Sequence, residues 1–430
     1  MGPAPTRSLS LFDCLCIMVG IIVGVGIFET SPTVAACMGD GGGTLLIWLV
    51  GGLLALCGAL CYAELASAYP SEGGDVIYLS RAYGPWAGFL FGWSQMMVIR
   101  PTDIALMAYV FARYASTLYA PVPHPIPLYA SLAVAGLTGI NMLGVRQGRW
   151  TQNVLTMVKV AAVLFIIGIG LLLPESGRSS YDGEASLSGI KLGLILVFYT
   201  YGGWHELAYV AAEIRNPEKN IVRAVVLGIL VVAALYLLIN AAFLRTLGYE
   251  AMAQSTGVAT DTVAKVLPSA ASRLIAAIIC ISALGTMNGM ILTGSRISYA
   301  LGQRHPLFIR LGHWHPRFGT PVRALLLQGI LSLAIVLLAG SFIDTILYSA
   351  PAVWMFFLGT GCSLFVLRKK DRDLERPFRV AGYPIVPSIF CLVCVFMFYG
   401  AVSYACVQRP IGLLALVGML AIGALLSRRK

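Results

Sequence analysis

The sequence predicts an all-α polytopic membrane protein, a single domain over residues 1–430 with 12 transmembrane helices. Hydrophobic residues make up 58% of the chain and charged residues only 11%, whereas about a quarter of the residues of a soluble domain are charged. Stretches of about 20 apolar residues, the length that crosses a bilayer, recur along the whole chain. Basic residues gather in alternate loops between these stretches. An ordinary water-soluble globule is therefore excluded.

Each expected span is an apolar stretch between polar residues, glycines or prolines. No polar linker is long enough to separate two soluble domains, since the longest polar stretches are 174–187 and 368–383. The expected spans are 11–37, 43–70, 86–119, 127–145, 151–174, 188–213, 221–247, 269–301, 321–340, 345–367, 384–407 and 410–427.

The uneven placement of basic residues predicts the orientation of the chain. Alternate loops are basic, and the opposite set holds few basic residues, among them Arg178, Lys191 and Arg409. Because cytoplasmic loops carry the excess of Lys and Arg, we expect both termini in the cytoplasm and the protein in the plasma (inner) membrane. The net charge of +11 then reflects topology in a lipid bilayer and indicates no nucleic-acid partner. The basic set is Arg146, Arg149, Arg215, Lys219, Arg223, Arg304, Arg310, Arg317, Arg368, Lys369, Lys370, Arg372, Arg376, Arg379, Arg428, Arg429 and Lys430.

Two expected spans are interrupted by glycines. The first contains "VGIIVGVGIFET" (19–30), and the sixth contains "YGGWHE" (201–206). Gly20 and Gly24 also have the spacing of a close helix–helix contact, which is the alternative use of such glycines. Lying five spans apart, the two interruptions predict inverted repeats over about 11–174 and 188–367, followed by extra helices in 384–427. Interrupted helices at matching positions point to the substrate site of a secondary transporter.

The chemistry of a helix break indicates the kind of substrate. Unpaired N–H and C=O groups in the membrane cost several kcal/mol each, on the order of a lost hydrogen bond in an apolar medium. The half-helix after a break presents its positive N-terminal end, which suits a carboxylate, and the freed carbonyls suit an ammonium group. Two facing breaks can therefore hold the head group of an α-amino acid.

Ionisable residues within the expected spans are functional candidates. Lys159 either extends its head group to the membrane interface or serves the transport cycle. Arg100 and Asp103 share one helix face, where they either form a structural ion pair or place Asp103 at the substrate pocket. Glu29 follows the first break, and His205 and Glu206 follow the second. His205 either gives transport a pH dependence or holds a freed carbonyl.

Seven segments resemble the amino acid–polyamine–organocation superfamily, and within it the L-type amino-acid transporters. They run nearly from end to end: "VGVGIF" (23–28), "GALCYAELASAYPSEGGDVIYL" (58–79), "IRP" (99–101), "YTYGGWHELAYVAAEIRNPEKNIVRA" (199–224), "LGTMNGMILTGSRISYA" (284–300), "HPRFGTPVRALLLQG" (315–329) and "ERPFRVAGYPIVP" (375–387).

The resemblance implies a five-plus-five inverted repeat of the leucine-transporter type with helices 1 and 6 discontinuous. It implies a substrate carboxylate on the N–H groups of Gly24, Val25 and Gly26, beside Ile27, and an ammonium on the carbonyls of Ile22 and Tyr199. Tyr199 aligns with an aromatic gate, Thr200, Gly202 and Trp354 border the pocket, and Lys159 stands where sodium-coupled relatives hold a cation. Gating or coupling is expected of Lys159, Tyr199, His205, Glu206 and Glu29.

These features favour a sodium-independent exchanger of L-amino acids, neutral ones first, that works by alternating access. The alternative is proton-coupled uptake of cationic amino acids or polyamines, for which Asp103, Glu29 and Glu206 are the motive. No enzyme motif of the HExxH or GxSxG type occurs, so we expect no enzyme activity. No cofactor is indicated, and His305, His313 and His315 lack the neighbouring carboxylates of a metal site.

Three departures limit the resemblance. Val25 replaces the family's serine in the first break, which removes a hydroxyl but keeps the backbone donors. His205 stands where animal members have asparagine. The outer loop "YAPVPHPIP" (119–127) lacks the cysteine with which animal members bind a glycoprotein. We therefore expect no disulfide-linked partner subunit and a prokaryotic source.

Overall fold

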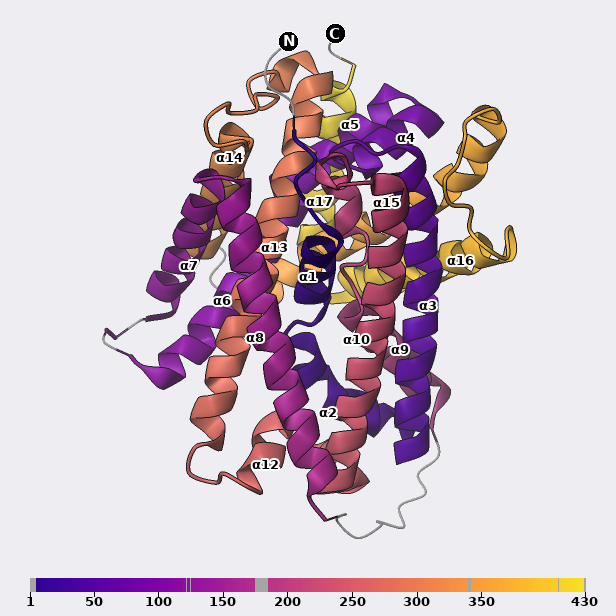
Figure 1. Cartoon of the computed structure of the whole chain (residues 1–430). Helices are drawn as coiled ribbons and strands as arrows, with labels where there is room; N and C mark the ends of the chain where they lie inside the picture. The colour runs from indigo at the N-terminus through magenta and orange to yellow at the C-terminus, as the bar shows by residue number, and fades with distance from the viewer. Residues whose placement is uncertain are drawn as a thin grey trace.

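The computed structural model describes residues 5–120, 122–123, 125–174, 185–338, 342–408 and 410–428. Within these ranges the chain is helical, and its only β pairing is three isolated bridges. The predicted all-α class is confirmed. Arg178, Arg409, Arg429 and Lys430 lie outside the described residues. Figure 1 shows one bundle of helices with both ends of the chain on the same side.

The α-helices of the described ranges follow one another with few long connections. Their bounds are α1 Leu11–Ile22, α2 Gly26–Met38, α3 Gly41–Ala68, α4 Asp75–Tyr83, α5 Pro85–Ser94, α6 Arg100–Leu118, α7 Pro125–Met142, α8 Val145–Leu172, α9 Leu187–Thr200, α10 Pro217–Leu247, α11 Tyr249–Gln254, α12 Val258–Ala264, α13 Ala271–Arg304, α14 Val322–Leu338, α15 Phe342–Lys370, α16 Ile385–Gln408 and α17 Pro410–Leu426.

Seven helices in the described ranges are long and apolar enough to cross a membrane, and a broken pair adds an eighth. The broken pair is α1 and α2, which bend by 49° at the predicted first interruption. Three further apolar helices are shorter. The seven are α3, α7, α8, α10, α13, and the segments Ser349–Lys370 and Ile385–Val407; the shorter three are Leu187–Thr200, Val322–Leu338 and Gly412–Leu426.

The predicted span 86–119 is not one regular helix. A π-helical turn, Gln95–Ile99, joins α5 to α6. Pro101 lies at the start of α6, and because proline has no N–H it cannot donate to the carbonyl four residues earlier. The widened turn lies where Gln95 and Ile99 border the central cavity, and such π turns are frequent at functional sites.

The prediction for the sixth span, 188–213, was wrong in its second half. Helix α9 ends at Thr200, as the glycines predict, but no α-helix resumes before Pro217. The chain instead makes short 3-10 turns, Glu206–Tyr209 and Ala211–Glu213. These turns are held by isolated backbone bridges, Leu9 with Ile214 and Glu72 with Val210, so pairing with two distant segments replaces helical bonds.

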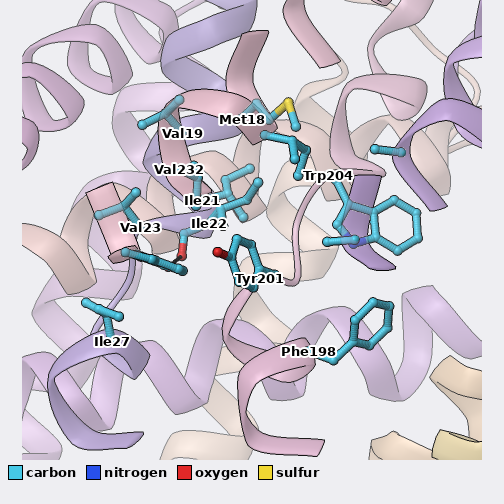
Figure 2. Packing of buried hydrophobic residues seen from close by; sticks show 14 of the residues in the cluster. Met18, Val19, Ile21, Ile22, Val23, Ile27, Phe198, Tyr201, Trp204 and Val232 are labelled. Atoms are coloured by element: carbon cyan, nitrogen blue, oxygen red, sulfur yellow. Dashed lines mark hydrogen bonds between the residues drawn. The ribbon is translucent and has the colours of Figure 1, made fainter. Parts of the chain in front are cut away.

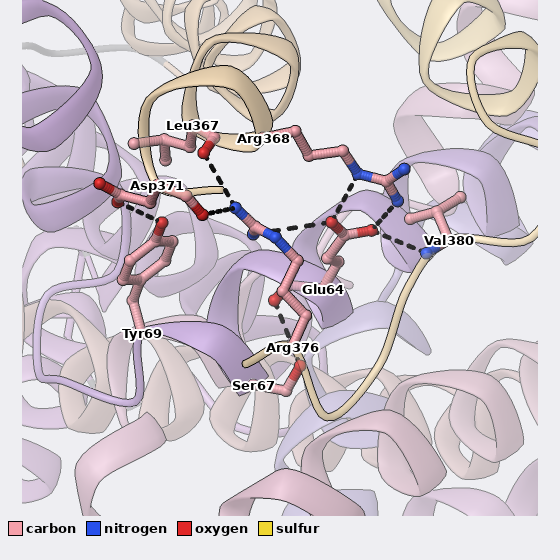
Figure 3. Close-up of polar contacts among 8 residues, drawn as sticks. All are labelled: Glu64, Ser67, Tyr69, Leu367, Arg368, Asp371, Arg376 and Val380. Carbon is pink, nitrogen blue, oxygen red and sulfur yellow. Dashed lines mark hydrogen bonds and ion pairs between the residues drawn. The ribbon is translucent and has the colours of Figure 1, made fainter. Parts of the chain in front are cut away.

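Buried ion pairs fix the ends of the helices on the side of the termini. Glu64 of α3 is fully buried and accepts hydrogen bonds from Arg368 of α15 (2.8 Å) and from the Val380 backbone N–H (2.7 Å), as Figure 3 shows. Nearby, the Tyr69 hydroxyl donates to Asp371 at 2.6 Å. That bond, followed by the contact with Arg81, lowers the pKa of Asp371.

Arg296 of α13 pairs with Glu213 at 2.7 Å, and both side chains are 1% exposed. Arg296→Met should lower the free energy of unfolding by about 3–5 kcal/mol, because Glu213 would remain as an unpaired buried charge. Replacing Glu213 by Gln in the same chain should recover most of that loss. Thermal unfolding in detergent measures both, with Arg310→Met at an exposed position as control. A single variant as stable as the parent would contradict this assignment.

Candidate functional site

The two interrupted segments lie against each other at the centre of the bundle. Gly203, in the second interruption, has φ +121°, and a Cβ there would lie 2.9 Å from Ile21 and 3.0 Å from Ile22. Only glycine combines that backbone conformation with so close an approach. Figure 2 shows Ile21, Ile22 and Val23 at the end of α1 beside Tyr201 and Trp204 of the second interruption. The tertiary structure thus joins the two predicted breaks.

The first break leaves three backbone donors without protein acceptors. The Gly24 N–H, predicted to hold a carboxylate, donates instead to the Ile22 carbonyl at 2.7 Å. None of the described residues accepts from the N–H groups of Val25, Gly26 or Ile27. Val25 directly precedes α2, and Gly26 and Ile27 begin it. Helix N-termini leave such donors and carry partial positive charge. Of the three N–H groups predicted to hold a carboxylate, that of Gly24 is therefore engaged within the protein, whereas those of Val25 and Gly26 are free.

The carbonyl groups at the breaks accept more hydrogen bonds from within the protein than the sequence predicts. The Tyr236 hydroxyl of α10 lies 2.8 Å from the Ile22 carbonyl oxygen and 3.2 Å from that of Thr200. The Ile22 carbonyl also accepts from Gly24, and the Tyr199 carbonyl accepts from Gly202 at 3.0 Å. Tyr236 was not predicted, because a single tyrosine inside an apolar helix gives no motif.

Lys159 of α8 supports the break in α1. Its ammonium donates to the Gly20 carbonyl at 2.6 Å and to Thr286 Oγ1 of α13 at 3.2 Å. The residue is 1% exposed, so extension of its head group to the interface, one of two alternatives, was wrong. Its Nζ therefore links the last turn of α1, in which Gly20 lies, to α13.

A row of polar side chains on one face of α8 holds α1 along its length. Asn153 donates to Asp13 at 2.7 Å, and Arg149 lies 3.4 Å from the same carboxylate. One turn further, Thr156 donates to the Cys16 carbonyl at 2.8 Å. Lys159 completes the row at Gly20. The spacing of three and four residues puts all four on one helix face.

A cavity opens beside the two breaks. Its wall is mainly apolar and aromatic, including Phe198, Val353, Trp354 and Phe357. Polar groups come from the breaks and from α6, together with Gln95, Thr286 and Ser349. A concave, mostly apolar site with a few placed polar groups is typical of a small-molecule site.

The charged side chains at the cavity are paired differently from the prediction. Arg100 does not form an ion pair with Asp103. It contacts Glu206 at 2.9 Å, and both side chains are 3% exposed. Thr293 also donates to Glu206, and His205 Nε2 lies 3.3 Å from it. Arg100 directly follows the π-helical turn, and Glu206 lies in the second interruption, so the ion pair links these two irregular segments.

Most of the predicted site residues lie at this cavity, and some do not. Ile27, Lys159 and Glu29 lie outside the cavity wall, and Glu29 is exposed, with the Tyr114 hydroxyl 3.4 Å from it. Sequence reasoning missed Gln95 and Thr286, which also line the cavity. The predicted residues that line it are Ile22, Gly24, Val25, Gly26, Asp103, Tyr199, Thr200, Gly202, His205, Glu206 and Trp354.

No three His, Cys, Asp or Glu side chains in the described part of the chain are grouped so that they could hold a metal ion. All ten cysteines are free thiols.

Comparison with known proteins gives a consistent result. The profile of the amino acid permease family matches residues 9–422. The b(0,+)-type amino acid transporter 1 of Mus musculus is 33% identical over 401 residues, which cover 91% of this chain and 82% of that protein. The serine/threonine exchanger SteT of Bacillus subtilis is 31% identical, with 89% and 88% covered. The human cystine/glutamate transporter is 30% identical, with 91% and 79% covered.

Weakening the polar row of α8 should release α1. Asn153→Ala with Thr156→Val removes two hydrogen bonds worth about 0.5–1.5 kcal/mol each. We expect the labelling rate of Cys16, now 3% exposed, to rise at least about fivefold, since 1.4 kcal/mol is a factor of ten. Maleimide labelling read by peptide mass spectrometry measures it. Val154→Ala, on the exposed side of α8, is the control. Unchanged Cys16 labelling would show that these bonds do not hold α1.

Proposed function

The chain belongs to the amino acid permease family, and on this basis we propose that it exchanges L-amino acids across the membrane without sodium. Its family and its relatives are transporters, so it is not an enzyme. The observation that carries the proposal is the pair of facing breaks, with the free N–H groups of Val25 and Gly26 at a cavity of mainly apolar lining. Those donors suit the carboxylate that all amino acids share.

Exchange is preferred to proton-coupled net uptake. One relative is named as a serine/threonine exchanger, and it matches 89% of this chain. The apolar wall suits neutral side chains, so neutral amino acids are expected among the substrates. The aromatic ring of Tyr199, half exposed at the cavity, is proposed as a gate over the bound amino acid.

Sodium independence is proposed from Lys159. A sodium ion at the end of α1 would need oxygen ligands such as the Gly20 carbonyl and Thr286 hydroxyl. Both already contact the Lys159 ammonium, whose charge would repel a second cation. The Lys159 ammonium would thus permanently occupy the position that a sodium ion would occupy only while it is bound.

We further propose the finer architecture that the family suggests: 12 spans, with the first five related to the next five by an inverted repeat. The two breaks lie in the first and sixth predicted spans, which is their place in such a repeat. An even number of spans agrees with termini on one side of the bundle (Figure 1). The basic loops favour the cytoplasm for that side, in the plasma membrane. Without a cysteine in the loop 119–127, we expect no disulfide-linked subunit.

Counterflow in proteoliposomes tests the function. Vesicles of the purified chain, loaded with unlabelled alanine, serine or leucine, should accumulate the labelled amino acid without sodium, at equal rates at two pH values. Empty vesicles should take up almost none. Accumulation by empty vesicles under an inward proton gradient would contradict exchange, and stimulation by sodium would contradict sodium independence.

Removing the Lys159 ammonium should slow the transport cycle. Lys159→Gln should lower exchange about tenfold or more, because a charge-assisted hydrogen bond contributes about 1.5–3 kcal/mol and positions the break. The rate of counterflow, normalised to reconstituted protein, measures this. Lys265→Gln, at an exposed position, is the matched control. Full exchange by Lys159→Gln would remove Lys159 from the mechanism.

A further inference from the structure

Besides His205, three acidic or basic side chains line the cavity, and two of them form an ion pair. Arg100 and Glu206 lie 2.9 Å apart and are almost fully buried. Thr293 donates a further hydrogen bond to Glu206, and the Arg100 guanidinium lies over the ring of Tyr209. The two opposite charges of this pair meet within the protein, and the buried Arg100 Nε has no hydrogen-bond partner among the described residues.

Asp103 is the third, and it has no partner. It lies one helical turn beyond Arg100 on α6, is partly exposed, and lines the cavity. No described residue forms a hydrogen bond or an ion pair with its carboxylate, and Arg100, the nearest candidate along the helix, is engaged by Glu206. Its cavity neighbours along α6 are Leu106 and Met107. An ionised carboxylate in such surroundings is costly unless a cation joins it.

Two other acceptors at the same cavity also lack donors. Gln95 Oε1 and His205 Nδ1 are buried without hydrogen-bond partners among the described residues, and both side chains line the cavity. His205 Nε2 contacts Glu206, which places the proton of a neutral ring on Nε2 and leaves Nδ1 as an acceptor. The carboxylate of Asp103, the amide oxygen of Gln95 and Nδ1 of His205 can therefore each accept a hydrogen bond from a ligand in the cavity.

We propose that Asp103 is a specificity-determining residue that admits amino acids with a positively charged nitrogen on the side chain. This inference rests on the proposed exchange of amino acids. The head group occupies the helix breaks, and the ammonium or guanidinium of a lysine or arginine side chain lies against Asp103. That contact supplies the missing countercharge, and its N–H groups can also reach Gln95 and His205. The apolar wall holds the methylene chain, so neutral amino acids bind the same site without this contact.

Competition counterflow tests the inference on the full-length chain. Vesicles loaded with unlabelled alanine receive labelled alanine together with external arginine or citrulline, which has arginine's shape without its charge. Arginine should compete at least tenfold more strongly than citrulline. Asp103→Asn should abolish that difference while alanine exchange changes less than threefold. Asp103→Glu should retain the preference, and Glu250→Gln, an exposed acid, should leave both measurements unchanged.

The possible results separate the two proposals. Exchange of alanine with equal competition by arginine and citrulline overturns the role of Asp103 and leaves amino-acid exchange standing. Loss of arginine and alanine transport together in Asp103→Asn, with folded protein, also overturns it. If Asp103→Asn does not fold, the arginine-to-citrulline ratio of the parent chain and of Asp103→Glu decides. No exchange of any amino acid by the parent overturns the proposed function itself.

Discussion

Interrupting two helices inside an apolar bundle leaves backbone groups that must find partners, and much of the surrounding structure meets this need. Tyr236 lies between the carbonyls of Ile22 and Thr200, one from each interrupted segment. Lys159 binds the carbonyl of Gly20. The N–H groups at the start of α2 have no acceptor among the described residues, and since unmet donors are costly in such surroundings, they form the natural place for a polar ligand.

The same need explains why side chains far apart in sequence converge. Helix α8 uses one polar face to hold α1, from Asp13 near its start to Gly20 in its last turn. This face is opposed to side chains of α8 that are exposed, such as Val154 and Met157. Helix α8 thus fixes the position of the first half of the broken span.

The charged side chains at the cavity are arranged differently from the groups that support the breaks. Arg100 and Glu206 form a buried ion pair, and removing one member would leave the other as an unpaired buried charge. Asp103, one turn away, is left for the ligand. The head group would thus be held by backbone dipoles that serve every amino acid, whereas side-chain selection would fall to Asp103 and the apolar wall.

The sequence by itself determined the helical membrane class, the family, the position of the first break and the end of α9, because hydropathy and glycine spacing are local properties. It also marked Lys159 and Asp103 as exceptional, because ionisable residues in apolar spans are rare. Only the tertiary structure decided which groups form ion pairs and hydrogen bonds with one another. Arg100 pairs with Glu206 instead of Asp103, the Gly24 N–H is already used, and Tyr236 occupies the Ile22 carbonyl. The segment after Thr200 forms turns because distant backbone from Leu9 and Glu72 pairs with it. Apart from the bond between Gly24 and Ile22, these contacts join residues more than a hundred positions apart, and no local pattern records them.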